Sequence, residues 1–260
     1  MDLIWLYQIS TFWLGFLIIG FFVLIAVVGL WLTRSLAKRI SRSENDFANY
    51  YIAVVAVVYA VLIGLIAAAS WDNYTSVEAL VSAEASSVSD LYRDVEGYPP
   101  ALRDQLRGML REYVHHVITE EWPAQRRGVV PRTHTAMVRR ISAGWAAFEP
   151  TTPGQQIAHA ECMHQLDELL SNRRQRLDAV DSNLPALMWI VVLFGAVIAI
   201  AMTFLFWTES WAFHVFLTIA FAVTLGLVIF LIVALDRPLV GSVSVPPTSF
   251  QELEDVMGPV

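Results

Sequence analysis

The chain has 260 residues, of which 56% are hydrophobic and 16% are charged, and its formal net charge at pH 7 is −7. This composition is too apolar for a soluble protein of this length and predicts an integral membrane protein. The negative charge argues against nucleic-acid binding, which needs a basic surface. A single cysteine, Cys162, excludes an intrachain disulfide and a Cys-x-x-Cys metal site.

Four apolar stretches are each long enough to cross a bilayer as a helix, which takes about 20 residues. The first lies within residues 1–33 and has no basic start, so we expect a retained span rather than a signal peptide. A short basic loop at 34–49 follows, and the second span runs from Tyr50 to Trp71 without a charged residue. The third and fourth spans lie at 184–207 and 212–235, on either side of a tight TESW turn.

The second span continues into a soluble amphipathic helix, because no Gly or Pro interrupts the chain between Gly64 and Gly97. Three more helices are expected at 100–121, 133–148 and 154–179, the first of them stopped by Pro123. Four helices joined by short loops predict a bundle.

The predicted fold is therefore all-α, with four transmembrane helices and a soluble four-helix bundle inserted between spans 2 and 3. Residues 1–71 carry the first two spans, 72–182 the bundle, and 183–235 the last two spans. Residues 236–260 form an extended tail with a short acidic helix at QELEDVM. An even number of spans places both termini and the bundle on one side of the membrane.

Several motifs carry a resemblance to a known family. They are YAVLIG and WDNY in the second span, DLYR and EWP in the soluble part, and ALDRP after the fourth span. Together they resemble the bacterial bestrophin-like membrane proteins, relatives of the bestrophin anion channels, over residues from about 49 to 250. The resemblance implies a homopentameric anion channel in the bacterial inner membrane, with a cytosolic helical domain.

Membrane orientation stays open at this point. The positive-inside rule places the basic loop at 34–49 in the cytosol and the bundle outside. The resemblance implies the reverse, with the termini and the bundle cytosolic. Three arginines that precede the third span, and Arg237 after the fourth, weaken the charge argument.

The resemblance also implies which residues line the pore. The neck positions of bestrophins correspond to Val57, Val61 and Leu65, which would form a hydrophobic constriction that gates by dewetting. These positions are aromatic in many bestrophins but not here, and the chain has no acidic cluster like the bestrophin calcium clasp. The alternative from the residues alone is that these side chains face lipid or a neighbouring helix.

A row of small residues runs along the same span. Small side chains let helix backbones approach closely in lipid, either within one chain or between copies around a symmetry axis. The row includes Ala60, Gly64 and Ala68.

Trp71, Asn73 and Tyr74 mark the point where this helix leaves the membrane. Trp and Tyr are common interfacial anchors. Asn73 could add polar contacts at a pore mouth.

Glu84 falls on the apolar face of the first soluble helix, between Val81 and Val88. A carboxylate there must be paired, neutralised or hydrated, because burying a bare charge is costly. We expect a bundle-core ion pair with an arginine of the next helix, with an ion or proton site in a vestibule as the alternative. The arginines considered are Arg103, Arg107 and Arg111.

Two Glu-x-x-His pairs occur on different predicted helices, Glu112/His115 and Glu161/His164. In a four-helix bundle this spacing can bind two metal ions when the other helices each add a glutamate. The third helix has no such glutamate inside it, so hydrated or hydrogen-bonded side chains are the alternative.

Three functions follow from these features. The leading hypothesis is an oligomeric ion channel in a lipid bilayer that conducts small inorganic ions, without enzymatic activity or a cofactor. The second is a non-conducting scaffold or sensor whose bundle binds a partner protein. The third is a metal-dependent membrane enzyme that uses the two Glu-x-x-His pairs.

Overall fold

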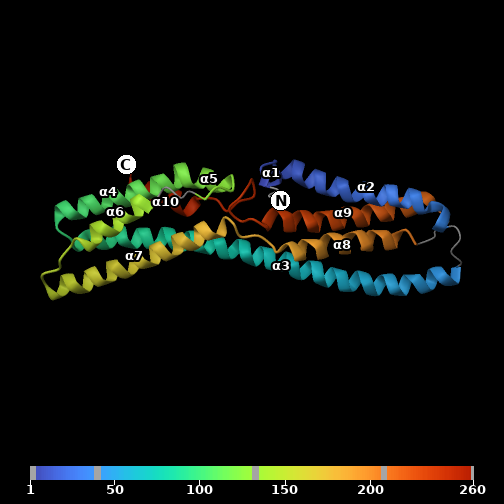
Figure 1. Cartoon of the computed structure of the whole chain (residues 1–260), viewed down its shortest axis with the longest axis horizontal. Coiled ribbons are helices and arrows are strands. Elements are labelled where there is room, and N and C mark those ends of the chain that lie inside the picture. The colour runs from blue at the N-terminus through green and yellow to red at the C-terminus, as the bar shows by residue number, and fades with distance from the viewer. Residues whose placement is uncertain (1–3, 38–41, 131–134, 206–209, 259–260) are drawn as a thin grey trace. The chain divides into compact units, whose positions relative to one another are not determined.

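The computed structural model describes residues 4–37, 42–130, 135–205 and 210–258, and these residues form helices, turns and loops without a strand (Figure 1). The chain divides into two compact units. One unit comprises Met1–Asn73 and Asn183–Asp236, and the other comprises Tyr74–Ser182 and Arg237–Val260.

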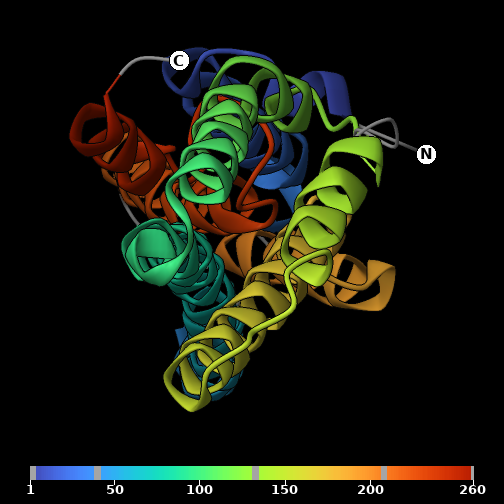
Figure 2. The same cartoon turned by 90° about the vertical axis from the view of Figure 1, so that its left-hand side faces the viewer.

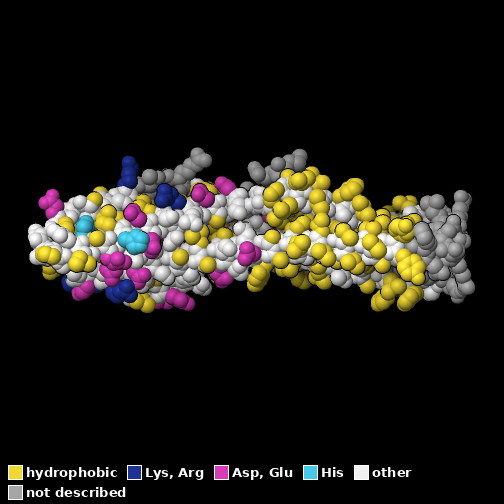
Figure 3. Space-filling view, turned by 90° about the horizontal axis from the view of Figure 1, so that it is seen from below, with side chains coloured by type: hydrophobic (Ala, Val, Ile, Leu, Met, Phe, Trp, Pro, Cys, Tyr) yellow, Lys and Arg dark blue, Asp and Glu magenta, His cyan; other side chains and the backbone are white. Residues whose placement is uncertain are grey.

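The membrane unit contains four helices long and apolar enough to span a bilayer, which confirms the predicted number of spans. Their side chains give this unit a largely hydrophobic surface on the face that Figure 3 shows. The end of the predicted third span and the first half of the TESW turn fall at 206–209, outside the described residues. The helices are the short α1 (Ile4–Tyr7), α2 (Thr11–Ala37), the first half of α3 (Arg42–Asp94), α8 (Ala186–Thr203) and α9 (Trp211–Leu235).

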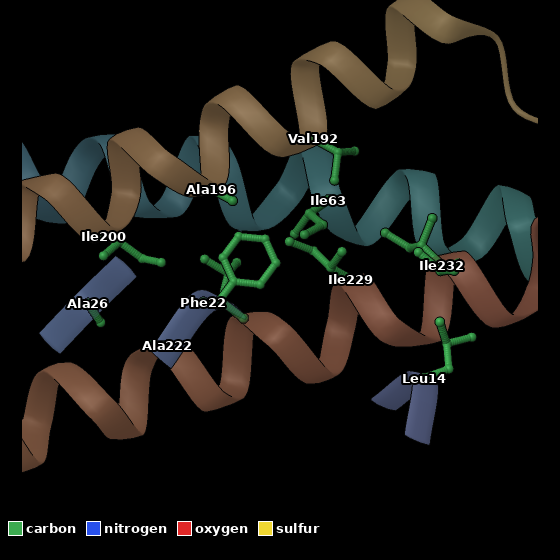
Figure 4. Close-up of a cluster of buried hydrophobic side chains, with 12 residues drawn as sticks. Leu14, Phe22, Ala26, Ile63, Val192, Ala196, Ile200, Ala222, Ile229 and Ile232 are labelled. Atoms are coloured by element: carbon green, nitrogen blue, oxygen red, sulfur yellow. The ribbon is translucent and has the colours of Figure 1, made fainter. Parts of the chain in front are cut away.

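Glycines allow close packing between the helices of this unit. A Cβ at Gly226 of α9 would lie 3.1 Å from the backbone of Ile19, so this glycine lets α2 and α9 approach. A Cβ at Gly195 of α8 would overlap the ring of Tyr59, so α3 and α8 also meet over a glycine. Buried side chains of all four helices fill the interior, including Phe22, Ile63, Ala196 and Ile229 (Figure 4).

The soluble unit is a helical bundle built on the second half of α3, which Figure 2 shows from one end. The prediction of one helix that continues past the apolar span is confirmed, because α3 is unbroken from Arg42 to Asp94. The other elements are η1 (Val95–Gly97), α4 (Pro100–His116), a π-helical segment η2 (Val117–Glu121), α5 (Trp122–Arg126), α6 (Thr135–Ala146), α7 (Pro153–Ala179) and α10 (Thr248–Met257).

Two boundaries differ from the prediction. The loop expected at 34–49 is largely helical, because α2 continues to Ala37 and α3 begins at Arg42; residues 38–41 lie outside the described part. Pro123 does not stop its helix. The N–H of Trp122 donates to the carbonyl of Val117, five residues back, and Pro123 then stands at the start of α5, where its missing N–H costs no hydrogen bond.

The C-terminal segment is not the extended tail that the sequence predicts. It folds onto the soluble unit, where the N–H of Gly241 donates to the carbonyl of Arg126 (2.9 Å) and the indole of Trp122 donates to the carbonyl of Val245 (3.1 Å). The segment also buries Phe250, which packs 6.0 Å from the Trp122 ring. This apolar burial favours the folded arrangement over an extended one.

Candidate functional site

The apolar half of α3 has few contacts with the rest of its own chain. Only 6% of this span is buried, compared with 28%, 22% and 33% for the spans in α2, α8 and α9. One stripe makes the contacts: Ile63 is buried, and the hydroxyl of Tyr59 donates to the carbonyl of Val192 (2.7 Å). Most of the surface of this helix therefore remains available for lipid or for other protein copies.

The predicted neck residues lie on the side of α3 away from that stripe. Val57, Val61 and Leu65 are 63%, 59% and 67% exposed. They follow at four-residue spacing, so they share one face of the helix. Ala60, Gly64 and Ala68 are exposed beside them, and a Cβ added at Gly64 would meet no atom within 4 Å. None of these six residues takes part in the core of its own chain.

The residues at the predicted membrane exit do not form one cluster. Trp71, Asn73 and Tyr74 lie within four successive positions of the unbroken α3, so their side chains point in different directions around the helix. Trp71 is exposed, whereas Asn73 and Tyr74 are partly buried. The position of Trp71 at the end of the apolar stretch is typical of an interfacial anchor.

The two Glu-x-x-His pairs are not brought together. Glu112 forms an exposed ion pair with Arg140 (3.1 Å), and His115 bonds to Glu254 of α10 (2.8 Å). His164 lies 3.5 Å from Glu168, and Glu161 accepts a hydrogen bond from Gln165. No group of three or more His, Cys, Asp or Glu side chains suited to a metal occurs among the described residues. The geometry therefore gives the metal-enzyme hypothesis no support.

The soluble unit contains a buried network of four charges. The carboxylate of Glu84 accepts two hydrogen bonds from Arg176, at 2.6 and 2.9 Å. The same guanidinium donates to Glu121 (2.9 Å), and Arg173 makes a bidentate pair with Glu121 (2.6 and 2.8 Å). Tyr113 donates its hydroxyl hydrogen to Glu84. Two guanidinium groups thus balance two carboxylates, and the network carries no net charge.

The members of the network come from four elements of the bundle fold. Glu84 lies on α3, Tyr113 on α4 and Glu121 on the π-helical segment, while Arg173 and Arg176 are one turn apart on α7. The wider π turn is a feature often found at functional sites, and here it carries Glu121. The network therefore ties the consecutive helices α3 and α4 to α7, which is distant in the sequence.

Aromatic rings cover the network. The Arg176 guanidinium lies 5.4 Å from the Trp122 ring centre and 5.9 Å from that of Phe250, within the range of cation–π attraction. Burial opposes the charge on Arg176, but Glu84 raises the pKa of the guanidinium above its usual value, so it stays charged. For the Tyr113 hydroxyl, burial has the opposite effect on the pKa and raises it. The hydroxyl therefore keeps its proton and can donate it in a hydrogen bond.

Glu84 is buried and paired, as expected, but the predicted partners were wrong. Arg103 and Arg107 pair instead with Glu96 near the end of α3. The reason is the antiparallel turn at Pro99-Pro100, which places the start of α4 beside the end of α3 and brings Glu84 level with Tyr113, later in α4.

A periodic signal for the other members was present in the sequence. Arg173 and Arg176 continue the spacing of the buried residues of α7, and Glu121 follows the buried Val117 by four positions. Charged residues in register with an apolar stripe indicate a buried ion pair, because unpaired burial would be too costly. The buried stripe of α7 comprises Cys162, Leu166, Leu169, Arg173 and Arg176.

Comparison with known proteins decides the family. The model of the bestrophin-like domain matches residues 20–250. The chain belongs to the bestrophin-like family. No curated protein matches this bestrophin-like chain.

Solved structures show the same fold. A mutant form of the bestrophin homologue from Klebsiella pneumoniae matches with a TM-score of 0.71 at 10% identity, over 94% of this chain and 97% of the homologue. A second structure of that homologue matches with a TM-score of 0.69 at 12% identity, over 94% and 98%. The bestrophin-like chain is thus an all-helical integral membrane protein with the bestrophin fold.

The network of this bestrophin-like protein should make its stability depend on pH. Burial alone would raise the pKa of Glu121, but the hydrogen bonds and charges of Arg173 and Arg176 outweigh burial and lower it from 4.5 to about 2. A lowered pKa contributes stability that is complete above the unfolded value and is lost as pH falls through the folded value. We therefore expect this contribution to be constant above about pH 5 and to disappear between pH 4.5 and about 2.

Thermal unfolding of the full-length protein in detergent, followed by circular dichroism across this pH range, measures the effect. Glu121→Gln should lower stability at neutral pH and flatten the acid dependence. Glu120→Gln is the matched control, because Glu120 is the exposed neighbour (66% side-chain exposure). Equal acid dependence in Glu121→Gln and the wild type would contradict the assignment.

Proposed function

We propose that this bestrophin-like protein assembles with copies of itself through α3 and forms an ion channel. The observation that carries the proposal is the 6% burial of the α3 span within its own chain. A helix that is apolar on all sides and has few intrachain neighbours is suited to pack against equivalent helices in lipid. The exposed small residues Ala60, Gly64 and Ala68 would allow those helices to approach closely.

The pore would be lined by the exposed face of α3. Val57, Val61 and Leu65 would form three successive apolar rings spread over about 12 Å along the helix axis. Rings of this kind gate by dewetting when they are narrow. In the proposed assembly the chain is a homopentamer in the bacterial inner membrane, with the bundle in the cytosol.

Anion selectivity is part of the proposal. The span from Tyr50 to Trp71 contains no charged residue, so no fixed ring of charge would lie within the constriction. Selectivity would instead come from polar groups near Asn73 and from the dipoles of the helix ends. Backbone dipoles contribute to selectivity in other channels as well.

Ion flux into liposomes containing the purified oligomer tests conduction. We expect chloride flux above that of empty liposomes. An intact oligomer without flux would contradict the channel proposal and favour a scaffold or sensor.

Shortening the neck residues should widen the pore. Leu65→Ala and Val61→Ala are each expected to raise conductance several-fold, because a smaller side chain weakens the dewetted barrier. Single-channel recording in a planar bilayer measures this. Leu24→Ala is the matched control, since Leu24 is similarly exposed (61%) but lies on α2, outside the proposed pore. Unchanged currents in Leu65→Ala and Val61→Ala would exclude these residues from the constriction.

A further inference from the structure

An open groove of about 450 Å³ lies within the membrane unit, between α2, α8 and α9. Only two of its lining side chains carry a polar atom, the hydroxyl of Tyr7 and the indole of Trp189. All the others are hydrocarbon. The lining residues are Tyr7, Leu17, Ile18, Phe21, Phe22, Ala186, Trp189, Leu193, Ile229 and Val233.

The two polar side chains lie at one end of the groove. Tyr7 precedes α2, and Trp189 stands in the first turn of α8. The Tyr7 hydroxyl donates to Asp236 (2.8 Å), the residue after α9, and Asp236 also accepts the N–H of Leu184 (2.7 Å). The end of α9 and the starts of α2 and α8 therefore meet here, at one membrane boundary. Tyr and Trp are enriched at this level of a bilayer.

From this end the groove extends about as deep as one leaflet. Its deepest lining residues are Phe22 on α2, Leu193 on α8 and Ile229 on α9. At 1.5 Å per residue, they lie about 10–17 Å along their helices from the Tyr7 end. The hydrocarbon core of a bilayer is about 30 Å thick, so one leaflet accounts for about 15 Å.

The size and chemistry of the groove select its occupant. Water does not fill apolar cavities of this kind. A neighbouring helix, about 10 Å wide, could cover the mouth of the groove, which makes it the alternative that the experiment must exclude. A single hydrocarbon chain is narrow, entirely apolar and one leaflet long.

We propose that this groove binds one acyl chain of a membrane phospholipid, whose glycerol and headgroup lie at the level of Tyr7 and Trp189. The lipid belongs to the leaflet at the Tyr7 end. At the deep end the groove is lined by the apolar side chains of Phe22 and Ile229, which offer no contact to a polar headgroup. This binding site is independent of ion conduction and concerns a different set of helices from the proposed pore.

Photocrosslinking tests the proposal. The full-length protein is reconstituted in vesicles of phosphatidylethanolamine and phosphatidylglycerol that contain a small fraction of phospholipid with a diazirine in its acyl chain. After illumination, mass spectrometry maps the labelled residues. We expect several-fold more label on the exposed groove residues Leu17 and Phe21 than on similarly exposed residues outside the groove, such as Phe216 and Leu217 of α9.

Filling the groove should remove this preference. Leu193→Trp and Leu17→Trp, which enlarge two walls from different helices, are each expected to reduce groove labelling several-fold. Phe194→Trp is the control, because Phe194 is 67% exposed on α8 but does not line the groove. Variants are compared only when they elute from size exclusion as the wild type does.

Two results would overturn the proposal. Labelling spread evenly over all exposed apolar residues would show that the groove holds no preferred chain. Crosslinks from groove residues to a second copy of the protein, in place of lipid, would show that the groove is covered by a neighbouring subunit.

Discussion

Replacing Arg176 with alanine is expected to destabilise the soluble bundle by about 3–5 kcal/mol, the range found when one partner of a buried ion pair is removed. The guanidinium holds Glu84 and Glu121 at the same time. Its loss would leave two buried carboxylates with a single arginine between them. Such a loss is a large fraction of the 5–15 kcal/mol that stabilises a typical domain.

Hydrogen exchange of the full-length protein in detergent, read on α4, α7 and the second half of α3, measures this effect together with thermal unfolding. Arg174→Ala is the matched control, because Arg174 is exposed on the same helix and bonds only locally to the carbonyl of Leu170. The control should change stability by no more than about 0.5 kcal/mol. If Arg176→Ala behaved like Arg174→Ala, the network would not stabilise the bundle.

Gly64→Leu is expected to abolish assembly while leaving the individual chain folded. A Cβ added at this position meets nothing within 4 Å inside the chain, and Gly64 is exposed, so we expect no intrachain clash. In the proposed assembly, however, Gly64 lies where neighbouring copies of α3 approach, and a leucine would hold them apart. Size exclusion with light scattering in detergent distinguishes an oligomer from a monomer.

Gly20→Leu provides the control. Gly20 is also exposed in a membrane helix and also has open space around its Cβ position, but it lies on α2. This variant should keep the oligomeric state of the wild type. An intact oligomer for Gly64→Leu would remove α3 from the subunit contact, and equal disruption by both variants would show a general effect of bulk in the membrane.

The membrane part of the fold could be predicted because its cause is local. A run of apolar residues long enough to cross the bilayer requires a helix, whatever lies beside it. The continuity of α3 could also be predicted, since no Gly or Pro occurs between Gly64 and Gly97. Both predictions depend only on residues that are neighbours in the sequence.

The other features of the fold and of the buried network could not be predicted, because they depend on contacts between residues that are distant in the sequence. The pairing of Glu84 with Arg176 spans 92 positions, and the choice between Arg176 and the nearer Arg107 is set by the level at which antiparallel helices meet. Pro123 would stop an α-helix but is accommodated after a π turn. The folding of the C-terminal segment required the surface of α5 to which Gly241 and Val245 bond.

The double role of Arg176 also restricts which residues can replace it. Its Nε and Nη2 groups serve two carboxylates from one rigid plane, whereas the ammonium of lysine is a compact charge on a flexible stem. An exchange of arginine for lysine is usually silent on a protein surface, but here it would leave one carboxylate poorly held. Residues 72–182 contain 12 arginines and no lysine, and at position 176 the geometry gives that preference a physical reason.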